Sequence, residues 1–226
     1  MKRSLQQRLR FRTWGGERLR AGRKRDPRSG VPHRARPKHR KDHPVHVTLR
    51  AVRRIPSLRK QLVFFEIRRA FAKTARSWFR IVHFSVQADH VHLLVEANDK
   101  TALSRGLAGA TIRLARAVNR VMRRSGSVFG DRYHARALET PREVRHALVY
   151  LLMNWKKHIA HARDFDPCSS ARSFEGWKVP PSQGPPEEPS SGLEVQRPAT
   201  WLLATGWKLH GLIGAHERPV SMQASK

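Results

Sequence analysis

The chain has 226 residues, 39% of them hydrophobic, which is enough to bury one core and short for two full domains. Its formal net charge of +29, from 46 Lys and Arg against 17 Asp and Glu, indicates a polyanionic partner, with nucleic acid as the leading candidate. The longest apolar run, residues 147–153, is too short to span a bilayer, so no membrane partner is expected. Because Cys168 is the only cysteine, an internal disulfide and a cysteine-based zinc site are excluded, and histidine, carboxylate and amide groups are left as metal ligands.

Residues 1–43 are dense in arginine and carry glycine and proline without sustained apolar periodicity, which predicts a disordered basic arm. The arm either draws the protein to phosphate groups or only raises its solubility. No apolar stretch of the kind found in secretory leaders follows the basic start, so we expect a cytoplasmic protein associated with the bacterial nucleoid.

The first core elements follow this arm. Residues 46–52 alternate in the manner of a strand with one buried face. Apolar residues at helical spacing then predict a helix over 56–77, with Ser57 as its N-cap. Two further strands, 80–87 and 90–97, are separated by only two residues, which is hairpin spacing, so the two strands should pair antiparallel.

A second helix is predicted over 101–124, with Asp99 or Thr101 as its cap. Four arginines of this segment follow one another in steps of three and four and therefore share one face: Arg113, Arg116, Arg120 and Arg123. No acidic residue interrupts this stripe. It forms either an ordinary solvated surface or, as we favour, a surface that contacts nucleic-acid phosphates.

Residues 132–138 have the pattern of a strand and precede Thr140-Pro141-Arg142-Glu143, a capping signature with proline at the first helical position. This signature predicts a third helix that runs to about residue 161. The order β-α-β-β-α-β followed by a helix predicts an α+β fold of the ferredoxin-like, split βαβ type. We expect a four-stranded antiparallel sheet with helices on one face, plus the C-terminal helix that carries Tyr150.

The predicted compact domain spans residues 44–177. The proline-rich stretch 178–198 has the composition of a linker. In the tail, residues 199–226, tryptophans and leucines between 199 and 213 indicate a short helix that docks back on the domain.

The most informative stretch is His90-Val91-His92-Leu93-Leu94-Val95-Glu96. On a strand His90 and His92 face the same side about 7 Å apart, which is close enough for both rings to bind one divalent ion. Two histidines at this spacing also occur by chance on exposed strands. The histidine pair alone therefore does not identify a metal site, and a second motif is needed beside it.

The third helix supplies that second motif. Tyr150 and Asn154 lie four residues apart and thus one turn apart on the same face, which His146 and His158 extend. Because apolar residues occupy the opposite face, Tyr150 lies on the polar side of an amphipathic helix, either as a packing residue or as a reactive group. The other tyrosine of the chain, Tyr133, has no amide four residues onward.

Together these motifs resemble the HUH-type single-tyrosine transposases, and in particular the REP-associated tyrosine transposases. The resemblance covers about residues 43–177 and rests on His46-Val47-Thr48-Leu49, His90-Val91-His92, the strand entry at 129–138 and Tyr150-x-x-x-Asn154. It implies that His90 and His92 are metal ligands, that Asn154 is the third ligand and that Tyr150 is the nucleophile.

The resemblance also implies the activity, a metal-dependent transposase that cleaves and rejoins single-stranded or hairpin DNA through a 5′-phosphotyrosine. Histidine, amide and phosphate ligands suit Mg²⁺ or Mn²⁺. Lys157 lies within reach of Tyr150 along the helix and is a further candidate for contact with DNA. Relatives include monomers and dimers, so either a monomer or a homodimer is expected.

Two other functions compete with this one. A domesticated, non-catalytic DNA- or RNA-binding protein would keep the fold and the basic surface, but the intact histidine pair and Tyr150 argue against it. A ribosome- or RNA-associated basic protein would account for the charge and leave the histidines, Tyr150 and Asn154 as a coincidence.

Overall fold

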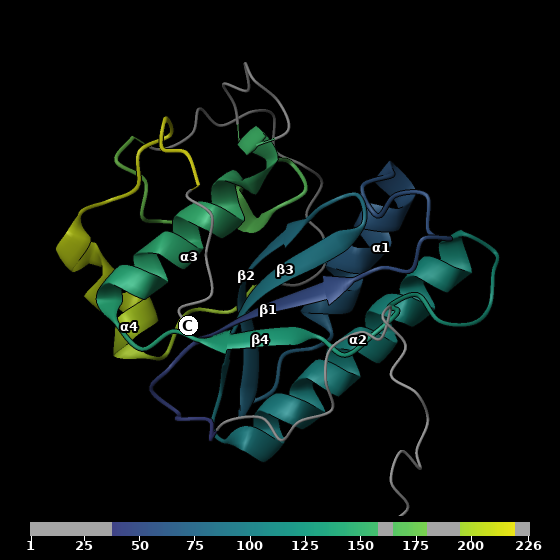
Figure 1. Cartoon of the computed structure of the whole chain (residues 1–226), viewed down its shortest axis with the longest axis horizontal. Coiled ribbons are helices and arrows are strands. Elements are labelled where there is room, and N and C mark those ends of the chain that lie inside the picture. The colour runs from purple at the N-terminus through teal and green to yellow at the C-terminus, as the bar shows by residue number, and fades with distance from the viewer. Residues whose placement is uncertain (1–37, 158–164, 180–194, 220–226) are drawn as a thin grey trace, which may run out of the picture.

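The computed structural model describes residues 38–157, 165–179 and 195–219, so most of the predicted arm and linker lie outside the described residues. At its centre is a four-stranded sheet in the order β2-β3-β1-β4, in which every neighbouring pair of strands is antiparallel (Figure 1). The strands are β1 (Val45–Arg50), β2 (Phe79–Val86), β3 (His90–Ala97) and β4 (His134–Ala137). Helix α1 (Gln61–Ala72) joins β1 to β2, and α2 (Lys100–Val121) joins β3 to β4. This architecture confirms the predicted α+β fold with its four-stranded antiparallel sheet.

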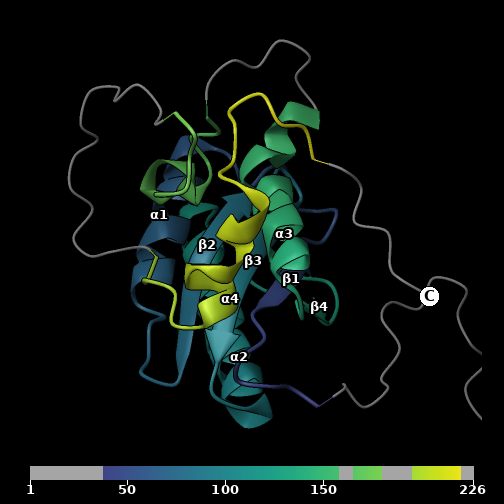
Figure 2. The same ribbon diagram turned by 90° about the vertical axis from the view of Figure 1, so that its left-hand side faces the viewer.

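Helices cover both faces of the sheet (Figures 1 and 2). Helices α1 and α2 pack on one face over the side chains of Val47, Leu49 and Leu93. The other face carries Leu94 and is covered by α3 (Pro141–Met153), α4 (Trp201–Ala204) and the 3-10 helix η3 (Gly206–His210). No helix in the described part of the chain is long and apolar enough to cross a membrane. The central strands are therefore buried on both sides.

Helix α1 is shorter at both ends than the predicted span of 56–77, and Ser57 does not cap it. The Ser57 hydroxyl accepts a hydrogen bond from the backbone N–H of Arg59 instead, in a turn before the helix. This turn buries Leu58 and lets its N–H donate to the carbonyl of Ala88, at 2.8 Å. Tertiary contacts therefore outweigh the helical spacing of this segment.

The predicted caps of the other two long helices are present. The Asp99 carboxylate accepts a hydrogen bond from the N–H of Ala102 at the start of α2. At the start of α3 the side chains of Thr140 and Glu143 form a reciprocal capping box. Both caps satisfy backbone N–H groups that the first helical turn leaves without partners.

Both of these helices end earlier than their apolar spacing predicts. Helix α2 ends at Val121, and Arg123 lies beyond it with a left-handed backbone angle φ of 47°. Helix α3 ends at Met153 and continues as the 3-10 helix η1 (Asn154–Lys157). The rest of the predicted third helix, 158–161, lies outside the described residues.

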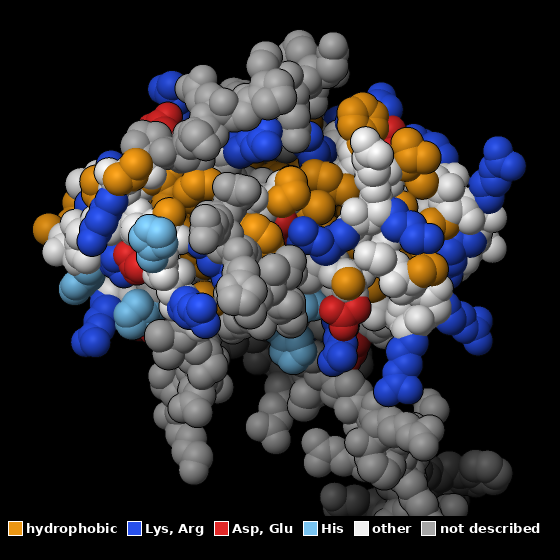
Figure 3. All heavy atoms as spheres, turned by 90° about the horizontal axis from the view of Figure 1, so that it is seen from above, with side chains coloured by type: hydrophobic (Ala, Val, Ile, Leu, Met, Phe, Trp, Pro, Cys, Tyr) orange, Lys and Arg blue, Asp and Glu red, His pale blue; other side chains and the backbone are white. Residues whose placement is uncertain are grey.

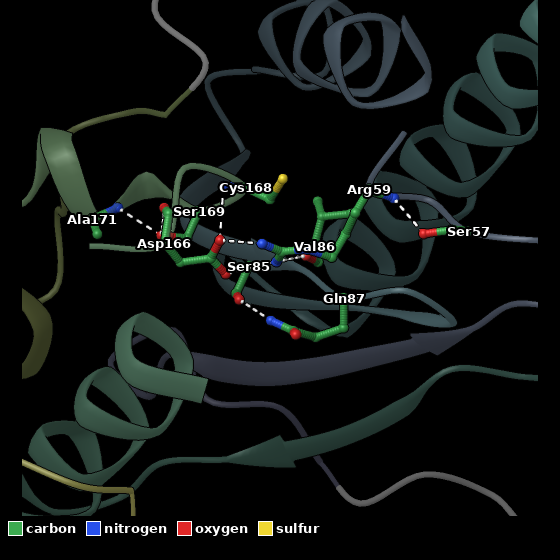
Figure 4. Close-up of polar contacts among 9 residues, drawn as sticks. All are labelled: Ser57, Arg59, Ser85, Val86, Gln87, Asp166, Cys168, Ser169 and Ala171. Atoms are coloured by element: carbon green, nitrogen blue, oxygen red, sulfur yellow. Dashed lines mark hydrogen bonds and ion pairs between the residues drawn. The ribbon is translucent and has the colours of Figure 1, made fainter. Parts of the chain in front are cut away.

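Residues 165–179 are fixed to the sheet by a partly buried ion pair between Arg59 and Asp166 (Figure 4). The Arg59 guanidinium donates hydrogen bonds of 2.7 and 2.8 Å to the Asp166 carboxylate and a third to the carbonyl of Val86. Asp166 is only 1% exposed and also accepts from the backbone N–H of Cys168. A buried carboxylate is tolerated only with such partners, so this pair holds the segment against the end of β2.

Residues 195–219 run beside strand β2 and then over the sheet (Figure 2). The backbone and side chain of Gln196 both bond to the backbone of Ile81. The buried Glu96 carboxylate accepts from the N–H of Ala199 and from the N–H and hydroxyl of Thr200. The segment therefore covers the edge of the sheet at β2.

His83 on β2 makes folding sensitive to acid. Its ring is buried, lies 3.2 Å from the Ser170 hydroxyl and meets Phe174 edge-on. Burial lowers the pKa of His83 to about 4, whereas an unfolded chain takes up this proton near pH 6.5. Because the unfolded state binds more protons between these values, the free energy of unfolding falls by up to about 3 kcal/mol as pH drops from 6.5 to 4.

We predict that His83→Gln makes the free energy of unfolding less dependent on pH between 6.5 and 5, as measured by urea denaturation. His210→Gln, at an exposed position on η3, is the matched control and should keep the wild-type slope. Equal slopes in both variants would show that His83 does not link folding to pH.

Candidate active site

Four aromatic rings from three elements meet on the α3 side of the sheet. The ring centroid of His92 on β3 lies 4.6 Å from that of His90 and 5.2 Å from that of Tyr150 on α3. His46 on β1 stacks on His92 at 5.2 Å and meets Tyr150 edge-on at 5.8 Å. The structure therefore brings together the two histidines and the tyrosine that the sequence singles out, and adds a third histidine.

The register of the central strands explains this meeting. Thr48 on β1 is the Cα partner of His92, so their side chains emerge on the same face. His46 and His90 lie two residues away on their own strands and share that face, because side chains alternate along a strand. Helix α3 packs on the same face and delivers Tyr150 to it.

Hydrogen bonds at the Nδ1 atoms orient both histidines of β3. The Nδ1–H of His90 donates to the Asp89 carboxylate at 2.7 Å, and this bond is the main cause that holds the pKa of Asp89 below its ordinary value. Nδ1 of His92 lies 3.1 Å from the Thr48 hydroxyl and 3.3 Å from Nε2 of His46. Nε2 is thus the nitrogen of each ring that can bind a metal ion, the arrangement usual for histidine ligands.

Burial sets the electrostatics of the other two rings. The pKa of His46 is lowered to about 4, first by burial and second by the charge of Arg136 on β4, so this ring is neutral near pH 7. Burial raises the pKa of Tyr150 above its ordinary value. A phenol with a raised pKa would need a neighbouring cation or base to react as phenolate.

The two remaining candidate residues, Asn154 and Lys157, lie in the 3-10 helix η1 that follows α3. Asn154 is 3% exposed at the junction of α3 and η1, one turn beyond Tyr150, and no hydrogen bond joins its amide to the four rings in the described part of the chain. Lys157 ends η1, and its side chain lies outside the described residues. The described residues contain no cluster of three or more His, Cys, Asp or Glu side chains that could hold a metal ion.

The C-terminal segment holds α3 in place. The Arg145 guanidinium donates two hydrogen bonds to Glu217, of 2.8 and 3.0 Å, and further bonds to the carbonyls of Gly211 and Leu212. Trp207 is buried in the same apolar cluster as α3. These contacts join residues far apart in the chain and fix the helix that presents Tyr150.

We predict that Arg145→Ala lowers the free energy of unfolding by about 2 kcal/mol, because Glu217 loses its paired cation. Arg142→Ala removes an exposed arginine from the same helix and serves as the control. Urea denaturation curves of the two variants compare them directly. A midpoint for Arg145→Ala equal to that of Arg142→Ala would contradict the anchoring role.

The predicted arginine stripe lies on the other layer of the molecule. Helix α2 packs on the sheet face opposite α3, so the stripe and Tyr150 are on opposite sides of the sheet. Arg116, Arg120 and Arg123 line one shallow depression with Asn119 and Arg124, although Arg123 is past the end of the helix. Arg113 is half-buried and does not line this depression, and Arg120 is 74% exposed beside Glu66, at 3.7 Å.

The strand that carries His46 and Thr48 forms part of the family resemblance, but the resemblance assigns no role to either residue. His46-Val47-Thr48 has the same period of two as His90-Val91-His92, so both of its polar residues face one side of a strand. Only the pairing of β1 with β3 shows that this side is the one that carries the histidine pair.

Fold and site together define an α+β protein with a histidine pair on a central strand that faces a tyrosine-bearing helix. A solved structure described as a REP-associated tyrosine transposase bound to a REP hairpin has the same fold, with a TM-score of 0.52. The two chains are 18% identical, and the similarity covers 72% of this chain and 98% of the other. No curated protein is similar in sequence.

Residues 39–150 match the model of the family described as IS200-like transposases. The matched region begins before β1 and ends at Tyr150, so it contains both strands of histidines and the tyrosine, and Asn154 lies just beyond it. The chain belongs to the IS200-like transposase family.

Proposed function

We propose that this protein is a single-tyrosine transposase in which Tyr150 attacks a DNA phosphodiester beside a divalent ion held by His90, His92 and Asn154. The observation that carries the proposal is the contact between the Tyr150 ring and His92, which joins the nucleophile of α3 to the histidine pair of β3. Membership in the IS200-like family gives the reaction class. The likeness to a hairpin-bound transposase supports hairpin DNA as the substrate.

The residues present fit a divalent metal ion. Both histidines have Nδ1 engaged in hydrogen bonds, which directs Nε2 toward a ligand, and Asn154 adds an amide on the facing helix. Neutral nitrogen and oxygen donors of this kind suit Mn²⁺ or Mg²⁺. Bound there, the ion would polarise a phosphate and stabilise the charge of the transition state.

The chain's own residues account for the covalent step. The Tyr150 oxygen forms a bond to phosphorus while the bond from phosphorus to the 3′ oxygen breaks, which gives a 5′-phosphotyrosine and a 3′-hydroxyl. The proton that leaves the phenol is balanced by the one that the 3′ oxygen gains. The phosphotyrosine retains the energy of the phosphodiester, so the 3′-hydroxyl of a second strand can reverse the step and rejoin DNA.

The basic surfaces are proposed to hold DNA around this centre. Lys and Arg are spread over the face seen in Figure 3 with few Asp and Glu among them. We assign Arg113, Arg116, Arg120 and Arg123 on the α2 layer, together with Lys157, to contacts with DNA phosphates. Because the arginines lie on the opposite side of the sheet from Tyr150, they would bind DNA that flanks the cleaved phosphate and not that phosphate itself.

We predict that Tyr150→Phe abolishes the covalent protein–DNA adduct and leaves hairpin binding intact, because the variant loses one oxygen and keeps the ring. Labelled single-stranded DNA that carries a hairpin, incubated with Mn²⁺, reports the adduct on a denaturing gel. Tyr133→Phe is the matched control and should form the adduct as the wild type does.

Mass spectrometry of the digested wild-type adduct locates the modified residue. A nucleotide on the peptide that contains Tyr133 would refute the assignment. Hairpin binding by the wild type without any adduct would favour a non-catalytic nucleic-acid-binding protein.

We predict that replacing Arg116, Arg120 and Arg123 together with Ala weakens DNA binding and makes its dependence on salt shallower, by about one unit of slope for each lost phosphate contact. Fluorescence anisotropy over a salt series measures both effects. Arg53 and Arg54, exposed in the loop after β1, provide a control pair of Ala substitutions. An unchanged slope in the triple variant would show that the stripe is ordinary solvated surface.

A further inference from the structure

A third histidine, His46, packs against both the candidate ligand His92 and the candidate nucleophile Tyr150, which also contact each other. It stacks on one ring at a centroid distance of 5.2 Å and meets the other edge-on at 5.8 Å. Its side chain is buried, and the chemistry proposed above assigns it no part. A buried imidazole in contact with two reacting groups is a candidate for a positioning residue.

The hydrogen bonds around His92 show what His46 can do. A neutral imidazole carries one proton, and Nε2 can bind a metal ion only when that proton is on Nδ1. Nδ1 of His92 has two neighbours within hydrogen-bonding distance, the Thr48 hydroxyl at 3.1 Å and Nε2 of His46 at 3.3 Å. Either one can accept the Nδ1 proton, and a proton held there leaves Nε2 of His92 as the lone-pair nitrogen.

We propose that His46 and Thr48 are positioning residues that hold the proton of His92 on Nδ1 and thereby prepare its Nε2 to bind the divalent ion. This inference rests on the proposed function, since it concerns the same metal site. Neutral His46 can accept through Nε2 when its own proton is on Nδ1.

His46 also fixes the angle between ligand and nucleophile. Its ring fills the space against both His92 and Tyr150, so neither ring can turn into that space. Mutation of residues that hydrogen-bond to metal ligands typically lowers metal affinity by about 10- to 100-fold.

The experiment compares two substitutions at one position in the full chain. His46→Phe keeps an aromatic ring against Tyr150 and removes the acceptor, whereas His46→Gln keeps a polar atom near the position of Nε2. We expect the affinity for Mn²⁺, measured without DNA by electron paramagnetic resonance, to fall about tenfold or more in His46→Phe. His46→Gln should stay much closer to the wild type.

His134→Phe is the matched control, because His134 is exposed on β4 and is the Cα partner of Thr48 on the side away from His92. Thermal unfolding followed by circular dichroism identifies any variant that loses its fold. Thr48→Val tests the second acceptor and should also weaken Mn²⁺ binding.

Nitrogen-15 NMR of histidine-labelled protein without metal reads the tautomer of His92 directly. The wild type should place the proton on Nδ1, and His46→Phe should shift the signal toward the Nε2-protonated form. Wild-type Mn²⁺ affinity and an unchanged His92 tautomer in a folded His46→Phe variant would overturn the inference. A wild type that shows the Nδ1 tautomer but binds no Mn²⁺ would support the positioning role and contradict the proposed metal site.

Discussion

The antiparallel pairing of β1 with β3 is the interaction on which the candidate site depends. It sets Thr48 opposite His92, so His46, Thr48, His90 and His92 emerge on one face of the sheet. A shift of the register by one residue would turn the partner strand over and send His46 and Thr48 into the apolar layer under α1 and α2. The apolar residues of that layer, Val47 and Leu93 among them, therefore fix the geometry of polar groups on the opposite side.

The two faces of the sheet differ in the side chains that they carry. The face under α1 and α2 is an apolar core, and the outer side of α2 carries the arginines. The face under α3 combines an apolar cluster with the histidines and the tyrosine. In the proposed function, a DNA strand would contact both the tyrosine side and the basic layer, and the sheet between them would keep their separation constant.

Buried polar groups of the domain are stabilised by specific partners. Asp166 is paired with Arg59, and Glu96 is bonded to the backbone of the C-terminal segment. His46 and His83 are instead kept neutral by burial. Both arrangements avoid an uncompensated buried charge. The paired carboxylates join distant segments of the chain, and the buried histidines make the stability of the fold depend on pH.

The sequence by itself predicted the fold, and it placed His90 and His92 on one face of a strand and Tyr150 on the polar side of a helix, because these features depend on local periodicity. Alternation on the strands, the hairpin spacing and the capping box at Thr140 gave the order of elements, and the spacing of His90 and His92 gave their common face. Only the tertiary structure decided that His46 packs against both His92 and Tyr150, that α1 begins at Gln61, and that Arg145 bonds α3 to Glu217. These contacts join residues far apart in the chain, and local patterns carry no information about which strands and segments meet.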